Sequence, residues 1–275
     1  MTSALFDSAA QNYDNTFTNT EIGKLQRARV WNYLNSILPN NSLNILELNC
    51  GTGEDAIWFA QKGHKVWATD ISEKMVEVGR LKVEQFNLSD KITVEQLDIN
   101  EINKASFPNR FDLVFSNFGG LNCLPDNELT VLSQRLKNLL TSTGRFVAVV
   151  MPDFCMTESL YFLSKFKFKE IFRRKMMQIV NVDNAFVKTY YYNPNRFWEY
   201  FKNEFNINKV LGVGLTIPPS YLNNFFEKKL NTLQLLNGTE NFFGNNLFSA
   251  SISDHYLIDL RIKNENPINT RLFSK

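Results

Sequence analysis

Apolar residues recur along the first half of the chain in blocks that alternate between two spacings. Short apolar runs, typical of buried parallel strands, occupy residues 43–48, 64–70, 92–97, 111–116 and 145–151. Segments 22–38, 56–62, 73–86 and 125–143 instead carry apolar residues at helical spacing. Five strands separated by crossovers predict a parallel sheet with helices on both faces.

The second half breaks this rhythm. Residues 153–175 are rich in aromatic and basic side chains, two β-like runs flank Asp183–Asn184, and 195–205 has a helical pattern. An insertion of this size is long for a crossover and predicts a substrate-side cap. A strand at 208–217, a helix at 220–236, an exposed loop at 237–246 and a last strand at 255–262 are then expected.

The first strand is followed by a glycine turn, which is the strongest local signal in the chain. Gly51 and Gly53 separate the strand from a helix, and glycines allow a backbone to approach a ligand closely. The first turn of the helix offers unpaired N–H groups to a polar or negatively charged group. Because the turn also fits the G-x-G-x-x-A form of the dinucleotide fingerprint, it predicts a nucleotide-like ligand without choosing one.

Composition adds few constraints on function. The net charge of +2 is too small to indicate a nucleic-acid partner. Three cysteines match no zinc or disulfide framework, which favours the reducing cytoplasm. The N-terminus lacks the pattern of a secretory signal, and no apolar run approaches the ~18 residues of a membrane span.

Five segments together resemble class I S-adenosylmethionine-dependent methyltransferases in order and spacing. They are Glu47–Gly53, Ala68–Ser72, Gln96–Ile99, Phe111–Asn117 and Gly144–Phe146. Phe6–Asp14 is also similar to the opening segment of many bacterial members. The match covers roughly residues 43–152, and the cofactor that it implies is S-adenosylmethionine.

This resemblance implies a three-layer, Rossmann-like α/β fold with a seven-stranded, mostly parallel sheet whose last strand is antiparallel. We expect an N-terminal helical cover at 1–42 and a cofactor-binding core at 43–152. An α+β cap inserted after the fifth strand, at 153–205, and a C-terminal part of the core sheet at 206–275 complete the predicted organisation.

Three acids that follow strands are candidate cofactor contacts. Asp70 ends the second strand, where nucleotide-binding sheets place an acceptor for a ribose diol. Glu47 would compensate the positive charge of a sulfonium ligand. The resemblance implies that Asp98 accepts from the adenine amino group and that Ile71, Met75 and Ile99 enclose the ring. Each acid could instead be a strand-end cap or a surface carboxylate.

Four further residues are candidates at the methionine end of the cofactor. Asn49 stands where the family usually has glycine, and its side chain would point toward the methionine moiety. Asparagine tolerates a positive φ, so the turn can still form. Asn117 lies at the mouth of the sheet, although it could be a turn former, and Tyr13 and Arg27 could close over the carboxylate.

Methyl transfer is an in-line displacement that requires positioning and exclusion of water, so no metal is expected. A base is needed only for some acceptors, and the residues leave open whether oxygen, nitrogen or carbon is methylated. His255 begins the last strand at the cofactor edge and is the candidate base, with a structural histidine as the alternative. His64 lies at the far edge, and we assign it no catalytic role.

The cap suggests the acceptor. Phenylalanines and tyrosines alternate with lysines and arginines between residues 161 and 175, which fits a small apolar or aromatic acceptor, or docking on an anionic membrane to reach a lipid. An amphipathic helix with solvated bases explains the same pattern. Two other functions stay open: a nicotinamide-dependent oxidoreductase and a non-catalytic protein that binds an adenosyl ligand.

Overall fold

The computed structural model describes residues 6–182 and 185–263. The turn predicted at Asp183–Asn184, residues 1–5 of the predicted cover and residues 264–275 of the predicted C-terminal segment lie outside the described residues. Among the described helices, none is long and apolar enough to cross a membrane.

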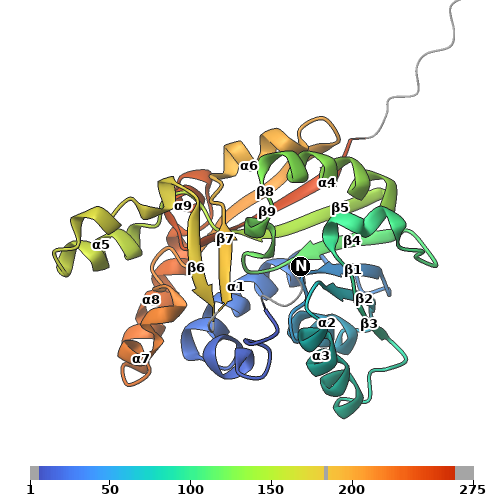
Figure 1. The fold of residues 1–275 in the computed structure, drawn as a ribbon, viewed down its shortest axis with the longest axis horizontal. Helices are drawn as coiled ribbons and strands as arrows, with labels where there is room; N and C mark the ends of the chain where they lie inside the picture. The colour runs from blue at the N-terminus through green and yellow to red at the C-terminus, as the bar shows by residue number, and fades with distance from the viewer. Residues whose placement is uncertain (1–5, 183–184, 264–275) are drawn as a thin grey trace, which may run out of the picture.

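A seven-stranded sheet forms the centre of the molecule (Figure 1). Its order is β3-β2-β1-β4-β5-β9-β8, and β9 runs antiparallel to both of its neighbours. The strands are β1 (Asn44–Leu48), β2 (Lys65–Asp70), β3 (Ile92–Gln96), β4 (Phe111–Ser116), β5 (Leu140–Val150), β8 (Phe205–Val213) and β9 (His255–Ile262). The predicted sheet, with its antiparallel last strand, is confirmed.

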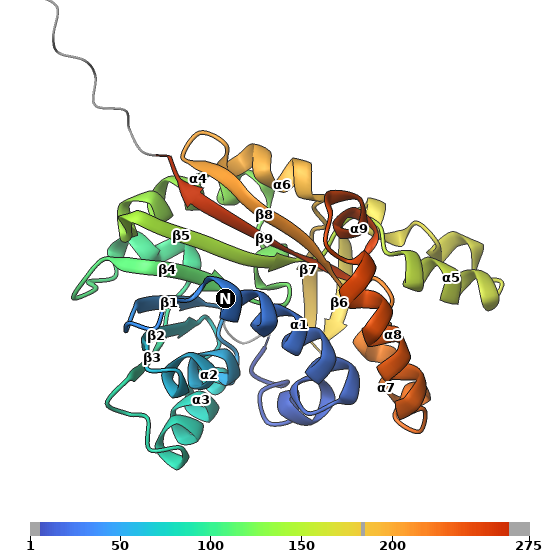
Figure 2. The same cartoon turned by 180° about the vertical axis from the view of Figure 1, so that it is seen from behind.

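Helices cover both faces of the sheet because each helix turns one apolar stripe toward it. One face packs on α1 (Glu21–Ile37), α2 (Glu54–Gln61) and α3 (Glu73–Gln85), through residues such as Leu34, Phe59 and Val76. The other packs on α4 (Asp126–Leu139) and α6 (Pro194–Phe201), through residues such as Leu132 and Phe197. Figure 2 shows this arrangement from behind.

An N-terminal segment lies over the carboxyl edge of the first strands. It includes a short π-helix, η2 (Asp14–Thr18), and leads into α1, which Thr20 caps by accepting from the Gly23 N–H. Short 3-10 helices follow β3 (η3, Ile99–Lys104) and β4 (η4, Gly120–Cys123) at the same edge.

The segment between β5 and β8 contains the predicted mixture of helix and hairpin. After β5 come α5 (Met156–Ser164), η5 (Phe168–Glu170) and η6 (Arg173–Lys175). The antiparallel strands β6 (Gln178–Val182) and β7 (Ala185–Thr189) then form a separate hairpin, which confirms the two predicted runs.

The C-terminal predictions were wrong in two places. The loop expected at 237–246 belongs mostly to α8 (Leu230–Phe243), while the helix expected at 220–236 is divided into η7 (Ser220–Leu222), α7 (Asn223–Phe226) and the start of α8. A further helix, α9 (Leu247–Ile252), precedes β9. Residues 140–143 were also expected in a helix and instead begin β5.

Candidate functional site

The site is built on the turn between β1 and α2. Asn49, Gly51 and Gly53 adopt φ values of 54°, 54° and 78°, which bring three residues of the turn into the left-handed region. The Cys50 N–H donates to the Thr69 carbonyl at 2.9 Å and fixes the turn beside the end of β2. The left-handed conformation that was expected for Asn49 is present.

Asp70 joins the turn to β2. Its Oδ2 accepts from the Gly51 N–H at 2.8 Å and its Oδ1 from the Ser72 N–H at 2.9 Å. Burial raises the pKa of Asp70, and these backbone hydrogen bonds oppose the rise. Because each carboxylate oxygen can accept a second hydrogen bond, Asp70 has capacity left for a ligand hydroxyl.

Glu47 is a buried carboxylate with an unsatisfied oxygen. The residue is 1% exposed, and its Oε2 has no hydrogen-bond partner. Burial, followed by the nearby charge of Asp55, raises its pKa well above the ordinary value. An orphaned carboxylate oxygen is costly, so Glu47 is suited to a cationic donor that the protein itself does not supply. These two acids therefore fit a cofactor that carries a ribose and a cationic group.

Asp55 is the functional candidate that the sequence did not reveal. Its Oδ2 accepts from Arg27 Nη1 at 3.1 Å and Asn117 Nδ2 at 2.9 Å, while its Oδ1 accepts from Trp31 Nε1 at 2.6 Å. Asp55 thus holds the predicted residues Arg27 and Asn117 together. An acid in the first turn of α2 was the available signal, but such acids are common because they complement the helix dipole.

Arg27 and Tyr13 come to the turn from the N-terminal segment. Arg27 is buried, its Nε has no hydrogen-bond partner, and its guanidinium lies 5.4 Å from the centre of the Phe118 ring. The surface position considered for Arg27 is therefore wrong. Burial raises the pKa of Tyr13 to about 12, so its hydroxyl is neutral.

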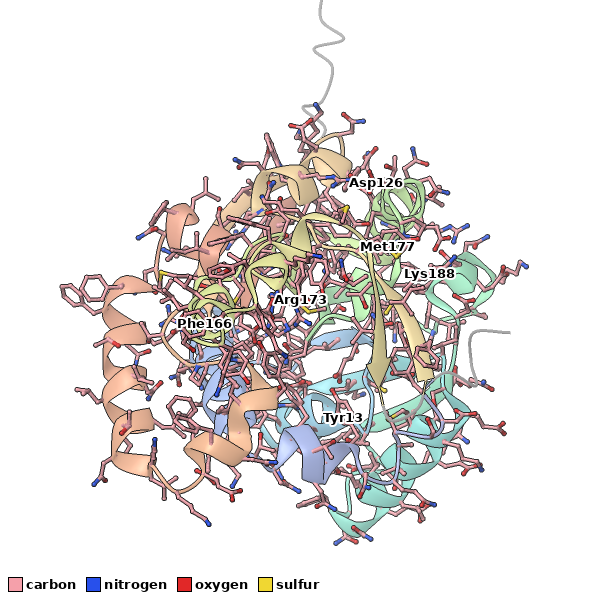
Figure 3. The ribbon with its side chains drawn as sticks, turned by 60° about the vertical axis from the view of Figure 1, so that its left-hand side comes forward. Tyr13, Asp126, Phe166, Arg173, Met177 and Lys188 are labelled. Atoms are coloured by element: carbon pink, nitrogen blue, oxygen red, sulfur yellow. The ribbon has the colours of Figure 1, made fainter. Side chains whose placement is uncertain are left out.

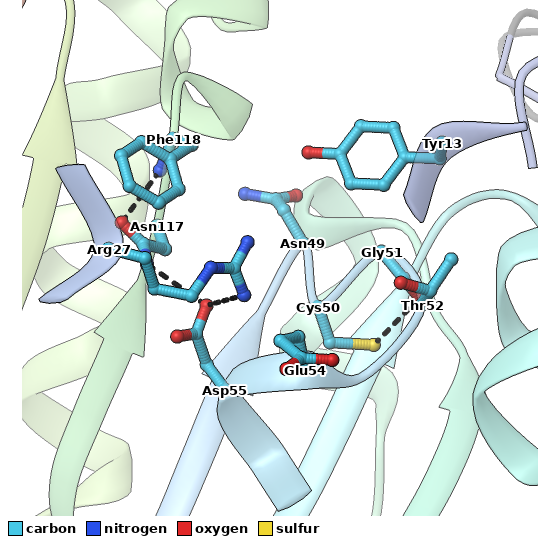
Figure 4. A pocket seen from close by; sticks show the side chains of 10 residues that line it. All are labelled: Tyr13, Arg27, Asn49, Cys50, Gly51, Thr52, Glu54, Asp55, Asn117 and Phe118. Atoms are coloured by element: carbon cyan, nitrogen blue, oxygen red, sulfur yellow. Dashed lines mark hydrogen bonds and ion pairs between the residues drawn. The ribbon is translucent and has the colours of Figure 1, made fainter. Parts of the chain in front are cut away.

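These groups enclose a small cavity above the glycine turn (Figure 4). Its empty volume is about 270 Å³, part of it open to solvent. The lining residues are Tyr13, Arg27, Asn49, Cys50, Gly51, Thr52, Glu54, Asp55, Asn117 and Phe118. This volume lies just below the range of about 300–1,000 Å³ that ligand pockets commonly span.

Asn49 points its side chain into this cavity, as Figure 4 shows. Its Nδ2 donates to Ser116 Oγ at 3.3 Å. A Cβ at Gly120 would lie 2.4 Å from Asn49 Nδ2 and 2.5 Å from its Cβ, so the absence of a side chain at Gly120 makes room for Asn49.

The predicted adenine contacts lie at the ends of β2 and β3, outside the lining of the cavity. Met75 is buried against Ala9 and Ala10 of the N-terminal segment. Asp98 caps η3 by accepting from the Asn100 N–H at 2.9 Å, so the capping role considered for it is present. Ile71 and Ile99 are half-buried.

His255 lies at the start of β9, at the expected edge of the sheet. Its ring meets that of Phe118 edge-on, with centroids 5.4 Å apart. Its Nδ1 is 3.2 Å from Asp254 Oδ2, within ion-pair distance but without hydrogen-bond geometry. Burial alone would raise the pKa of Asp254, but His255 and Arg174 hold it well below the ordinary value. His64 instead packs against Phe59 and accepts from the Leu43 N–H through Nδ1.

Comparison with known proteins shows that part of this chain is similar to methyltransferases. Residues 45–144 match a family model described as a methyltransferase domain. The chain is 34% identical over 119 residues to demethylmenaquinone methyltransferase of Bacteroides fragilis, a match that covers 42% of this chain and 46% of that protein. It is 29% identical over 90 residues to tRNA 5-carboxymethoxyuridine methyltransferase of Escherichia coli, covering 32% of this chain and 34% of that one.

The whole fold also has solved counterparts. A S-adenosylmethionine dependent methyltransferase from Mesorhizobium loti superposes with a TM-score of 0.57 at 20% identity, over 86% of this chain and 99% of that one. At this identity the likeness concerns the fold. The chain matches about half or less of the length of the two relatives named above.

Proposed function

We propose that the protein is a class I S-adenosylmethionine-dependent methyltransferase that transfers a methyl group from this cofactor to a small apolar or aromatic acceptor, since residues 45–144 match a methyltransferase domain. The observation that carries the proposal is the orphaned Glu47 carboxylate at the end of β1, with the carboxylates of Asp55 and Asp70 close enough to raise its pKa. The anionic diphosphate of a nicotinamide dinucleotide would instead be repelled by so many acids beside the turn.

The residues at the two ends of the turn would hold different parts of the cofactor. Asp70 would accept from the ribose hydroxyls, and Glu47 would face the positive charges. Arg27 and Tyr13 would bind the carboxylate, while Ile71, Met75, Asp98 and Ile99 would bind the adenine. When bound, the cofactor supplies an activated methyl group on a sulfonium, which leaves as a neutral thioether once the acceptor has taken the methyl.

The protein contributes orientation and a dry site. Asp55 fixes the guanidinium of Arg27 and the amide of Asn117 through a shared carboxylate oxygen. Phe118 packs between Arg27 and His255 and closes the inner wall of the cavity. Methyl transfer depends on the alignment of the methyl group with the acceptor atom. Fixed protein dipoles and the exclusion of water assist such a reaction.

His255 is the proposed proton acceptor for an acceptor that must lose a proton. Its ring lies at the carboxyl edge of the sheet against Phe118, with its Nδ1 3.2 Å from Asp254 Oδ2. We expect His255→Gln to slow transfer to a hydroxyl acceptor without changing cofactor affinity.

The acceptor class rests on the cap. Its aromatic and basic side chains suit an apolar molecule that carries an acid, and such a molecule can be delivered from a lipid surface. One of the relatives above is a demethylmenaquinone methyltransferase, and a demethylmenaquinone is an acceptor of the class that we propose. The three free cysteines in the described part of the chain fit our proposal of a cytoplasmic location.

Turnover of methyl-labelled cofactor tests the proposal. The full chain is incubated with labelled S-adenosylmethionine and a panel of quinols, phenols, aromatic acids and bulk tRNA. We expect label in a small acceptor that is extracted into organic solvent. The Asp70→Ala variant should lose the activity, and Asp90→Ala, at an exposed residue before β3, should keep it.

Three results would contradict the proposal. Label in tRNA would make nucleic acid the acceptor. Cofactor binding without turnover across the panel would favour the non-catalytic alternative. Binding of NADH in place of S-adenosylmethionine, measured by fluorescence, would favour the oxidoreductase.

A further inference from the structure

Large apolar side chains are exposed mainly on one side of the molecule. Among the described residues, 21 large hydrophobic side chains are exposed, of which nine lie between Leu160 and Phe186 and eight between Tyr221 and Phe248. The whole first half of the chain contributes only three. Exposed apolar groups of a monomeric protein are ordinarily scattered, so this clustering indicates an interaction surface.

The densest part of this surface is a projection that we call the arm, residues 156–175, containing α5, η5 and η6 (Figure 1). Phe166, Phe168 and Phe172 are 80%, 61% and 61% exposed on it. They alternate with exposed lysines at 165, 167 and 169, none of which forms an ion pair within the described structure. Rings and free positive charges are therefore displayed together.

The hairpin β6–β7 continues the surface. Register pairs Ile179 with Lys188, and alternation along each strand puts Ile179, Phe186 and Lys188 on one face. Ile179 and Phe186 are 61% and 66% exposed, whereas Val187 on the opposite face is buried. Figure 3 labels Phe166 on the arm and Lys188 on the hairpin in one view.

The base of the arm is fixed, so the exposed rings are not simply unpacked. Glu158 of α5 is 2% exposed and accepts from both Arg173 and Arg174. Arg174 also donates to the Asp254 carbonyl at 2.8 Å and to Asp254 Oδ1 at 2.7 Å. The buried charges thus attach the arm to the start of β9 while its rings point away from the core.

Phe166 has an unfavourable backbone for its residue type. It follows the end of α5 with φ 56°, at a position where helices usually have glycine. A bulky residue in this region is strained. A strained backbone that displays an 80% exposed ring fits a ring that contacts a partner.

We propose that the arm and the outer face of the β6–β7 hairpin dock on an anionic lipid surface. Rings can enter the headgroup region while lysines contact negative lipids, as in other interfacial elements. Of the six basic residues at 165–175, Arg173, Arg174 and Lys175 pair with acids of the protein, which leaves the three exposed lysines at 165, 167 and 169 for an anionic surface. RNA is less well matched, because the exposed apolar groups include Leu160, Leu163, Met176 and Ile179, which do not stack on bases. A second copy of this chain is also a poorer partner for this surface, because the lysines of the two copies would repel each other.

Vesicle binding by the full chain, without cofactor or acceptor, tests this proposal independently of methyl transfer. Vesicles of phosphatidylcholine are compared with vesicles that contain about one quarter phosphatidylglycerol. We expect binding to the anionic vesicles only, weakened by added salt because exposed charges are screened.

Two variants and one matched control sharpen the test. Phe166→Gly should lower partitioning about tenfold and leave the melting temperature unchanged or raised, since glycine suits the positive φ. Replacing Lys165, Lys167 and Lys169 by glutamine should lower it about a hundredfold. Phe86→Ser, at a 52% exposed ring after α3, should have no effect.

Equal binding to both vesicle types, or to neither, would overturn the proposal. So would binding of tRNA, or self-association that Phe166→Gly abolishes, in a protein that does not bind the vesicles. Loss of vesicle binding in Phe86→Ser as well as Phe166→Gly would show that the arm is not the docking site.

Discussion

At the scale of single residues, Glu47 and Asp70 show how two buried strand-end acids can differ. Asp70 accepts two backbone N–H groups, whereas Glu47 has an oxygen without any partner. The protein's own backbone therefore hydrogen-bonds the Asp70 carboxylate, whereas the Glu47 oxygen needs a donor that the protein does not supply. In our proposal, Glu47 would therefore contribute to cofactor binding at a cost to the stability of the ligand-free protein.

This difference predicts opposite effects of Glu47→Gln on stability and binding. Burial raises the folded-state pKa of Glu47. At pH values between the ordinary glutamate pKa and this raised pKa, the native state keeps a proton that the unfolded state has lost. Native stability therefore falls as pH rises through that window. At pH above neutral, Glu47→Gln should raise the free energy of unfolding by about 1 kcal/mol. This gain in stability should be smaller near the ordinary pKa of glutamate. The same substitution should weaken cofactor binding about tenfold. Denaturation at several pH values and calorimetry measure the two effects. A variant that loses both stability and affinity would contradict this account.

Asn49 and Gly120 form a second residue-scale test. Because Gly120 leaves room for the Asn49 side chain, Gly120→Ala should lower the free energy of unfolding by about 2 kcal/mol. In an Asn49→Gly background, the same substitution should cost less than half as much. Urea denaturation of the four proteins in this double-mutant cycle measures the coupling.

Gly238→Ala provides the matched control for that cycle. A Cβ at Gly238 meets nothing within 4 Å, and the residue lies inside α8, so alanine should stabilise by about 0.5–1 kcal/mol. Additive effects of Gly120→Ala and Asn49→Gly would disprove the steric coupling.

The candidate site could be found from the sequence only where position along a strand implies position in space. Glu47 and Asp70 lie at the carboxyl ends of β1 and β2, and Asn117 directly follows the parallel strand β4, so their common edge was predictable. Asp55 was missed because its importance comes from Arg27 and Trp31 of α1 and from Asn117 after β4, two segments distant in the sequence. No local pattern distinguishes it from an ordinary acid in the first turn of a helix.

At the scale of elements, the alternating strands and helices of the first half were predictable because each carries a clear period. The polar segment 237–246 was misassigned because its helix depends on a distant contact. Glu240 of α8 is fully buried and accepts from the backbone N–H groups of Gly214, Leu215 and Thr216. These hydrogen bonds stabilise a helix that local propensity does not favour.

The N-terminal segment is an element whose attachment can be tested. Asp14 Oδ1 accepts from Thr52 Oγ1 at 2.6 Å, and Lys82 Nζ donates to Asp14 Oδ2 at 2.9 Å. Burial would raise the pKa of Asp14, but these hydrogen bonds lower it, so the attachment is present above the ordinary range of an aspartate and lost as pH falls.

Asp14→Asn should therefore loosen the cover over the cavity. We expect S-adenosylhomocysteine to dissociate about five- to tenfold faster, with a loss of unfolding free energy of about 1 kcal/mol or less. Stopped-flow fluorescence measures the dissociation rate. Glu73→Gln, at an exposed residue of α3, is the control and should not alter it. An unchanged rate in Asp14→Asn would show that the segment does not retain the ligand.

At the scale of the whole molecule, the sheet brings the cofactor corner and the start of β9 to one edge. The carboxyl ends of β1, β2 and β4 supply Glu47, Asp70 and Asn117, and the antiparallel β9 returns His255 to the same place. The insertion between β5 and β8 is attached to this edge through Arg174 and Asp254. One fold therefore positions the proposed cofactor site, proton acceptor and docking arm on connected elements.

Calorimetric titration of S-adenosylhomocysteine into the full chain tests the central claim most directly. We predict saturable binding at one site, weakened roughly ten- to a hundredfold by Asp70→Ala because a buried diol loses its acceptor, and unchanged by Asp90→Ala. Cooperative thermal unfolding of both variants would establish that they are folded. Absence of binding to the unmodified protein, or equal affinity in Asp70→Ala, would contradict the account.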